Sequence, residues 1–221
     1  RQIRHRATQN DAFHSDRAVA GLNFTHFISE KSFVDATLSW AANRQTYDAS
    51  RLQQVYLREE NFTNQAYRLS LQFNHKFNAQ HSLRTGVILS NLRFQLLNRT
   101  TDGTKVSTTL NQQGDTYLLQ AYSQWKYRIS PLLTLNAGFH ATLLALNQQS
   151  SLEPRGGLRW NFAPRHALSV GVGVHSRTEG LSTYFAEVKA KDGTISYANK
   201  NLALLKSAHF VLGYEFRPRD G

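Results

Sequence analysis

Residues 151–177 read SLEPRGGLRWNFAPRHALSVGVGVHSR, and the second half of this segment alternates strictly between apolar and small or polar residues. Leu168, Val170, Val172 and Val174 occupy one set of positions. Successive side chains of a β-strand point to opposite faces, so the pattern predicts a strand with one apolar and one polar face. A soluble protein would bury the apolar face in a core, whereas a membrane barrel would turn it toward lipid.

The same period of two runs through most of the chain, and helical periodicity is nearly absent. Residues 67–77 and 117–129 show it most clearly, and counting such stretches predicts about nine strands. The alternation persists for about ten to fourteen residues per strand, whereas soluble strands average about five or six. Strands that cross lipid need about nine to eleven residues. Strand length therefore favours a membrane barrel.

The connections between the predicted strands fall into two classes. Short turns are expected at residues 30–31, 79–81, 130–131 and 163–165, with another beginning at 217–218. Longer polar connections are expected at residues 43–65, 98–115, 147–151 and 178–201, the third of them short. Outer-membrane barrels have short periplasmic turns and longer extracellular loops. The sorting of the connections therefore indicates the same class of fold.

Aromatic residues mark the expected limits of the membrane. Tyr67 and Phe77 lie ten positions apart on one apolar face, as do Tyr117 and Tyr127 on another. About ten residues of a tilted strand rise roughly 25 Å, the height of the apolar band of a membrane barrel. The expected periplasmic aromatic girdle consists of Phe77, Trp125, Tyr127, Trp160, Phe162, Tyr214 and Phe216. The predicted fold is all-β, an antiparallel up-and-down transmembrane β-barrel.

Three stretches carry a family resemblance: SLEPRGGLRW from Ser151, VGVGVHSRTEGLSTYF from Val170 and NKNLALLKSAHFVLGYEF from Asn199. Together they resemble the C-terminal half of the barrel of TonB-dependent outer-membrane receptors, particularly those with a carboxypeptidase-regulatory-like N-terminal domain. The resemblance implies a large barrel plugged by a globular domain. It also implies uptake of scarce solutes with energy delivered from the inner membrane through TonB.

Residues 1–221 are expected to form a single segment of such a barrel. Nine strands are an odd and insufficient number, and an open sheet edge is not tolerated in lipid. The plug domain, the segment that contacts TonB and the remaining strands are absent from the sequence, which starts at Arg1 and has no methionine. We therefore expect part of a mature protein of the outer membrane. The expected partners are its own plug, TonB, outer-membrane lipid, lipopolysaccharide and a small-molecule or oligosaccharide substrate.

No catalytic, metal-binding or cofactor-binding motif stands out. The chain has no cysteine, its 9 histidines are scattered without ligand spacing, and no G-x-S-x-G motif is present. The excess of 26 Lys and Arg over 15 Asp and Glu gives a formal charge of +11. This charge is dispersed among alternating strands and not gathered on one face with stacking aromatics, which argues against nucleic-acid binding. We therefore expect a protein that is not an enzyme and needs no cofactor.

Candidate binding residues come from the polar faces and the longest loop. Arg155, Arg159, His175 and Arg177 are expected in the lumen, where they are solvated, contact the plug or guide an anionic solute. Tyr184 and Phe185 are expected as exposed loop aromatics that contact a solute such as a sugar or a siderophore.

Three functions stay open at this point. The first is solute transport, the second is a structural or adhesive outer-membrane barrel, and the third is a soluble secreted β-sandwich that binds a polymer.

Overall fold

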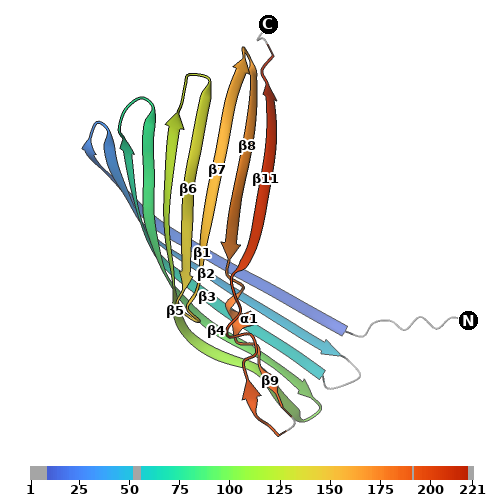
Figure 1. The fold of residues 1–221 in the computed structure, drawn as a ribbon. Coiled ribbons are helices and arrows are strands. Elements are labelled where there is room, and N and C mark those ends of the chain that lie inside the picture. The colour runs from blue at the N-terminus through green and yellow to red at the C-terminus, as the bar shows by residue number, and fades with distance from the viewer. Residues whose placement is uncertain (1–8, 52–55, 191, 219–221) are drawn as a thin grey trace, which may run out of the picture.

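The computed structural model describes residues 9–51, 56–190 and 192–218, and nine of its strands form one antiparallel sheet (Figure 1). Each strand pairs with the next along the chain, so the order is β1 to β8 followed by β11. The bounds are β1 (Gln9–Ser29), β2 (Ser32–Arg51), β3 (Tyr56–Lys76), β4 (His81–Asp102), β5 (Lys105–Arg128), β6 (Leu133–Leu144), β7 (Gln149–Ala163), β8 (His166–Arg177) and β11 (Leu205–Phe216). The prediction of an up-and-down sheet of nine strands is confirmed.

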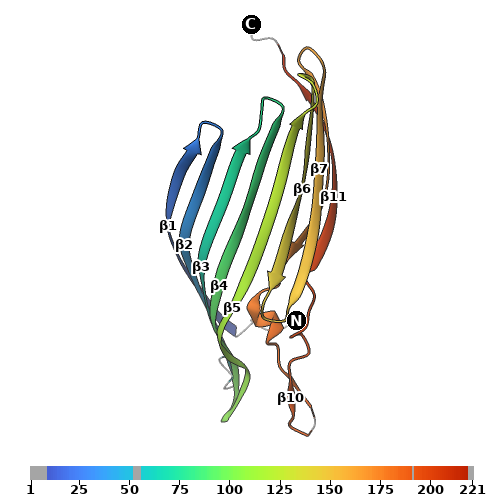
Figure 2. The same ribbon diagram turned by 60° about the vertical axis from the view of Figure 1, so that its left-hand side comes forward.

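The sheet is curved and open. Figures 1 and 2 show it as an arc whose two ends are β1 and β11, which pair only with β2 and β8. The connection between β8 and β11 carries the short helix α1 (Leu181–Tyr184) and a small hairpin of β9 (Val188–Lys189) and β10 (Ile195–Ser196). Its helix lies against the strands inside the arc, whereas the hairpin projects toward the end opposite the short turns (Figures 1 and 2). Among the described residues, no helix is long and apolar enough to cross a membrane.

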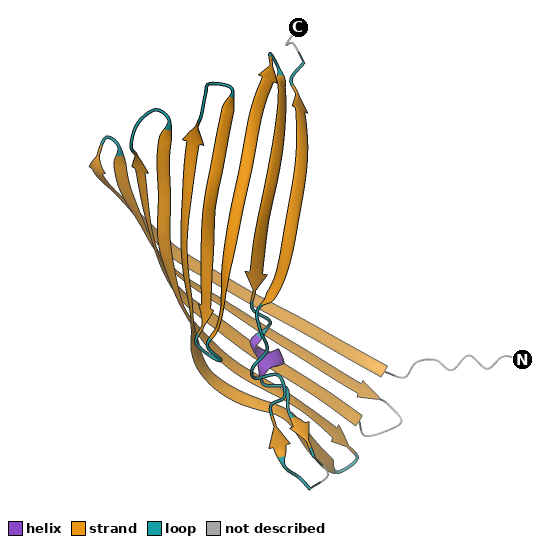
Figure 3. Cartoon of the chain, in the orientation of Figure 1, coloured by secondary structure: helices purple, strands orange, loops and turns teal. Residues whose placement is uncertain are grey.

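The short turns lie together at one end of the sheet, as predicted (Figure 3). Side chains satisfy backbone groups in two of them. The Asn78 side chain accepts hydrogen bonds from the N–H groups of Gln80 and His81, both at 2.8 Å. Ser130 Oγ accepts the N–H groups of Leu132 and Leu133 at 3.2 and 3.1 Å. These local bonds favour tight reversal of the chain at this end.

The first five strands are longer than expected. They contain 20 to 24 residues each, and the polar connections predicted at 43–65 and 98–115 are wrong. Residues 43–50 and 57–65 continue the β2–β3 ladder, and β4 passes into β5 through a turn at Gly103, where φ is +60°. In these extensions most residues on both faces are polar, although Phe94, Leu96 and Leu110 are apolar. The alternation of polarity therefore stops while backbone pairing continues. The long connection predicted at 178–201 is present: residues 178–204 lie between β8 and β11 and contain α1 and the small β9–β10 hairpin.

The pairing register gathers the apolar positions on one face. Leu71, Val87, Ala121, Ala141 and Leu152 follow one another across five adjacent strands. Three of them are exposed, at 41% for Leu71, 52% for Val87 and 65% for Leu152. A continuous exposed apolar face of this size marks contact with lipid or another protein. Within the described residues no second sheet covers it, so the β-sandwich alternative is not supported.

The opposite face is polar and lines the hollow of the arc. Gln72, Gly86, Tyr122, His140 and Glu153 follow one another in register. The connection between β8 and β11 packs on this side of the sheet. We call this side the inner face and the apolar side the outer face.

The seven predicted girdle aromatics lie near the short-turn end. Two histidines interleave with them: the ring of His81 lies 5.4 Å from Trp125 and 4.3 Å from Tyr127, and His166 lies 5.8 Å from Phe162. His166 also contacts Tyr214 and Phe216. The placement agrees with a girdle, and its contact with a membrane interface stays a prediction.

The two faces can be tested by neighbouring substitutions on β3. Leu71→Arg should lower the free energy of unfolding by about 2–4 kcal/mol, because it places a charge in lipid near mid-membrane. Ser70→Arg, on the inner face, should change it by less than about 1 kcal/mol. Denaturant titration of the full-length protein refolded in lipid vesicles measures both values. An equal loss in the two variants would contradict the assignment of the faces.

Candidate functional site

One polar network on the inner face joins four strands. Asp35 accepts hydrogen bonds from Thr25 Oγ1 at 2.6 Å and from the side-chain amides of Gln72 and Asn74, both at 3.3 Å. The hydroxyl of Tyr122 donates to Gln72 Oε1 at 2.8 Å from β5. The network holds β1, β2, β3 and β5 in one arrangement.

The ring of Tyr122 crosses β4 only because Gly86 lies beneath it. A Cβ atom at Gly86 would stand 2.7 Å from the Tyr122 hydroxyl and 2.7 Å from the backbone oxygen of Leu71. Any side chain at this position would therefore displace the ring or the strand.

A second network surrounds a buried carboxylate. The side chain of Glu153 is 1% exposed. Its Oε1 accepts hydrogen bonds from Ser151 at 3.0 Å, Ser176 at 2.5 Å and Thr142 at 3.4 Å. Its Oε2 accepts one from Arg155 Nη2 at 2.8 Å and lies 3.4 Å from His140 Nδ1. A buried charge is tolerated only with such partners. Glu153 therefore ties β6, β7 and β8 together.

The predicted lumen residues fall into separate groups. Arg155 and His175 converge over Gly173, where a Cβ atom would lie 3.4 Å from a side-chain atom of each. Arg159 lies nearer the short turns, and its Nη2 is 2.6 Å from Glu215 Oε2. Arg177 ends β8, opposite Leu205.

Sequence reasoning missed the two carboxylates that neutralise these arginines. Glu153 precedes Arg155 by two positions, which places both side chains on one face of the strand. This spacing was a signal for that ion pair. Arg159 and Glu215 are 56 residues apart in sequence. Their pairing could be predicted only from the order of the strands in the sheet.

The prediction that Tyr184 is exposed is wrong. Its side chain is fully buried, packed with Leu144 and Leu204, and its hydroxyl accepts the backbone N–H of Glu179 at 3.3 Å. Phe185 is half-buried, and its ring lies 4.9 Å from that of Phe94 on β4. The apolar residues of the loop turn back into the hollow because the extended strands offer Phe94, Leu96 and Leu110 there. We call these contacts the mouth cluster.

The β9–β10 hairpin extends beyond the mouth cluster. Gly193 takes a φ of +89° at its turn, and the backbone N–H of Thr194 donates to Asp192 Oδ1 at 2.9 Å. This bond lowers the pKa of Asp192 below its ordinary value. Val188 and Ile195 are each 51% exposed, and Gln112 on β5 donates to the Tyr197 hydroxyl at 2.8 Å. The hairpin thus presents exposed apolar side chains at the end of the molecule opposite the short turns.

Metal chemistry finds no support in the described ranges, where no three histidine or acidic side chains gather closely enough to hold an ion. The inner face and the mouth offer hydrogen-bond donors, acceptors, charges and aromatic rings. Such a surface is suited to binding and guiding a solute.

Known proteins resemble the whole chain. The family model described as TonB dependent receptor-like β-barrel matches residues 1–221. Similar solved structures include the RagAB peptide transporter, with a TM-score of 0.62, 11% identity and coverage of 95% of this chain and 29% of that chain. For the ferric citrate transporter FecA the TM-score is 0.62 and the identity is 12%, with coverage of 93% of this chain and 33% of that chain. For the siderophore receptor PirA from Pseudomonas aeruginosa the TM-score is 0.54 and the identity is 13%, with coverage of 94% of this chain and 44% of that chain.

The chain therefore spans less than half the length of each of these three proteins, between 29% and 44%. At 11–13% identity these likenesses show the fold alone. No curated protein sequence matches the chain.

The buried carboxylate is the first target for mutation. Glu153→Ala should lower the free energy of unfolding by about 2–4 kcal/mol, because it leaves the buried hydroxyls of Thr142 and Ser151 without their acceptor. Glu59→Ala removes the partner of Arg99 on the strand extensions and should cost about 1 kcal/mol or less. Guanidinium titration of the protein refolded in lipid compares the two. Similar losses would show that Glu153 stabilises the protein no more than an ion pair on the strand extensions does.

The mouth cluster can be tested through its buried ring. Tyr184→Ala should raise the rate of tryptic cleavage within residues 178–204 at least about tenfold, because loss of a buried aromatic removes more packing free energy than a tenfold change requires. Tyr197→Ala, in the same connection but 36% exposed, should change the rate less than about threefold. Equal rates in the two variants would contradict the packing of the loop in the hollow.

Proposed function

Because the chain belongs to the family of TonB-dependent receptor-like β-barrels, we propose that it forms part of the wall of an outer-membrane transporter for a scarce solute. The observation that carries this proposal is the pair of faces, apolar outside and polar inside, on one open, curved sheet. Lipid would cover the outer face, and a solute would pass along the inner face.

The open edges support a larger barrel. β1 and β11 each leave one side without a strand partner in the sheet, and hydrocarbon offers no hydrogen-bonding groups to replace it. Further strands of the same protein would close the barrel, and a plug domain would fill it and connect it to TonB. Lys206 stands beside Leu152 on the outer face toward the outer rim, and it would reach lipopolysaccharide phosphates.

Solute recognition is proposed at the inner face and the mouth. Arg155, Arg159, His175 and Arg177 would contact anionic groups of the solute, and Phe185 would contribute a ring at the mouth. Arg155 and Arg159 already hold Glu153 and Glu215. Attraction of an anion therefore depends more on His175 and Arg177. Tyr184, being buried, would act by holding the loop in place.

The orientation in the membrane can be tested by thiol labelling. The chain has no natural cysteine, so a single introduced one is the only thiol in this segment. Cysteine replacing Ser107, at the tip of the β4–β5 hairpin, or Asp192, in the β9–β10 turn, should react with an impermeant maleimide on intact cells.

Cysteine replacing Gln80, in a short turn, is the matched control. It is exposed like the other two, and it should react only after the outer membrane has been permeabilised. Labelling at Gln80 together with protection at Ser107 and Asp192 would invert the proposed orientation, and labelling of all three would contradict a membrane-spanning wall.

A further inference from the structure

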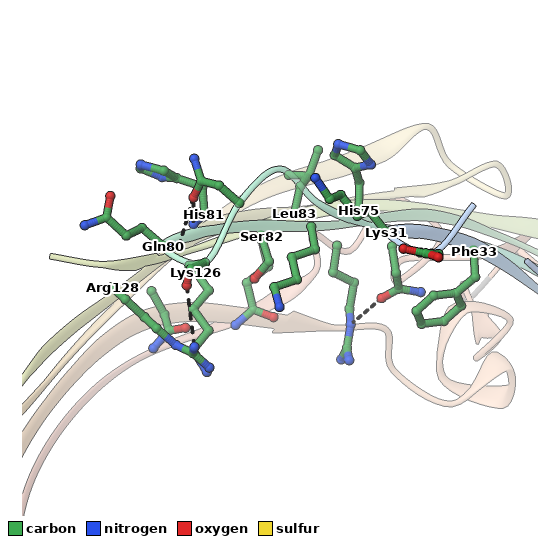
Figure 4. Close-up of a pocket in the computed structure, with 17 residues that line it drawn as sticks. Lys31, Phe33, His75, Gln80, His81, Ser82, Leu83, Lys126 and Arg128 are labelled. Carbon is green, nitrogen blue, oxygen red and sulfur yellow. Dashed lines mark hydrogen bonds between the residues drawn. The ribbon is translucent and has the colours of Figure 1, made fainter. Parts of the chain in front are cut away.

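Four histidines lie on the outer face, close to the short turns. Each pairs across the ladder with an apolar or aromatic residue: His26 with Val34, His75 with Leu83, His81 with Tyr127 and His166 with Phe216. Directly opposed residues of an antiparallel pair point to the same face of the sheet. Figure 4 shows His75 and His81 on the side of the strands opposite Lys126 and Arg128. The four imidazoles therefore belong to the face that the proposed function turns toward lipid.

Neither a plug nor further strands would cover three of these histidines. A plug would fill the inner side of the arc, and additional strands would join the sheet at its free edges, β1 and β11. His75, His81 and His166 stand on β3, β4 and β8, and each of these strands has a partner on both sides. We call these three residues the girdle histidines. In the proposed wall their outward side meets the membrane.

The girdle histidines share one hydrogen-bonding arrangement, in which Nδ1 is engaged within the protein. Its contacts join Nδ1 of His81 to Trp125 Nε1 at 3.2 Å, of His166 to the Tyr214 hydroxyl at 2.7 Å and of His75 to Ser32 Oγ at 2.7 Å. A tryptophan N–H can only donate, so Nδ1 of His81 is an acceptor and the proton of the neutral ring is on Nε2. These bonds leave Nε2 of each ring for another partner, and at His81 that nitrogen is a donor.

Aromatic rings fix the level of these imidazoles in the proposed membrane. Trp125 and Tyr214 are exposed, whereas His81 and His166 are half-buried beside them. The ring of His81 also stacks on that of Tyr127, with an angle of 13° between the planes. Belts of tryptophan and tyrosine lie at the level of the lipid headgroups. The imidazoles among these rings therefore stand at the level of the headgroup phosphates and not among the acyl chains.

We propose that the girdle histidines bind the phosphate groups of phospholipids in the periplasmic leaflet. A phosphate oxygen is an anionic acceptor, and hydrogen bonds to an anionic acceptor are shorter and stronger than those between neutral groups. Arg165, exposed in the turn just before His166, adds positive charge there. Leu83 and Val87 continue the outer face along β4 from His81, and they would contact the acyl chains of the same lipid. This continuity favours a lipid headgroup over a free phosphate ion.

This inference rests on the proposed membrane wall and adds a class of lipid to its partners. Thiol labelling tests the wall, and lipid binding tests the histidines. Correct labelling together with a lipid affinity that does not depend on the histidines would overturn this inference alone. Inverted labelling would overturn the orientation on which both depend.

Native mass spectrometry of the full-length protein in a maltoside detergent measures the affinity for added lipids. Phosphatidylglycerol should bind at least about threefold more tightly than a glucosyl diacylglycerol with the same acyl chains, because only the first carries a phosphate. His81→Phe/His166→Phe keeps both aromatic rings and removes their N–H groups. It should weaken the binding of phosphatidylglycerol at least about threefold and leave that of the glucosyl lipid unchanged.

The matched control is His14→Phe/His209→Phe, which makes the same substitutions at exposed positions of β1 and β11 away from the girdle. It should change the affinity for phosphatidylglycerol less than about 1.5-fold. If the first double variant does not refold, His166→Phe alone should weaken binding about twofold or more. Equal affinity for the two lipids, an equal loss in the control variant, or displacement of the lipid by inorganic phosphate would overturn the proposal.

Discussion

Backbone hydrogen bonding between neighbouring strands is the constraint on which the rest of the structure depends. Hydrocarbon satisfies no N–H or C=O group, so a chain that crosses it as strands must pair each one with a neighbour. Pairing every strand with the next in sequence meets this demand with the shortest connections. It also makes the register continuous from β1 to β11. Side chains far apart in the sequence then share rows that cross the whole sheet.

The rows explain where polar groups can be placed. An outer-face row such as that of Leu71 and Val87 carries no side chain that needs a hydrogen bond, whereas the inner face accumulates donors and acceptors. Asp35 and Glu153 are costly to remove from water, and each is surrounded by partners from neighbouring strands. The inner networks therefore add side-chain bonds across the same strands that the backbone already joins, which makes the interior a rigid polar wall.

The period of two was sufficient to predict the sheet. It was insufficient to predict how long the first five strands are or how the mouth cluster packs. The strict alternation around Val170 and Val172 separates the apolar face of the sheet from the polar face, because the face on which a residue lies decides its polarity there. Past the apolar band this cause disappears. Residues 43–51 and 105–115 therefore look like loops in sequence although their backbones remain paired. Tyr184 shows a different limit: its burial depends on Leu144 and Leu204, which lie 40 and 20 positions away and come together only after the sheet has formed.

The two ends of the sheet are stabilised by different sets of interactions. At the end opposite the short turns, the extended β4 and β5 are joined by a turn at Gly103, where an added Cβ atom would have no other atom within 4 Å. Ion pairs such as that of Arg99 with Glu59 and the packing of the mouth cluster stabilise these strand extensions. At the other end, tight turns close each hairpin with local bonds to Asn78 and Ser130. Among the described residues, the ion pairs at this end all involve Glu215, which binds Arg159 from across β8 and Arg217 two positions along the chain. Local turn bonds therefore do most of the work of closing these hairpins.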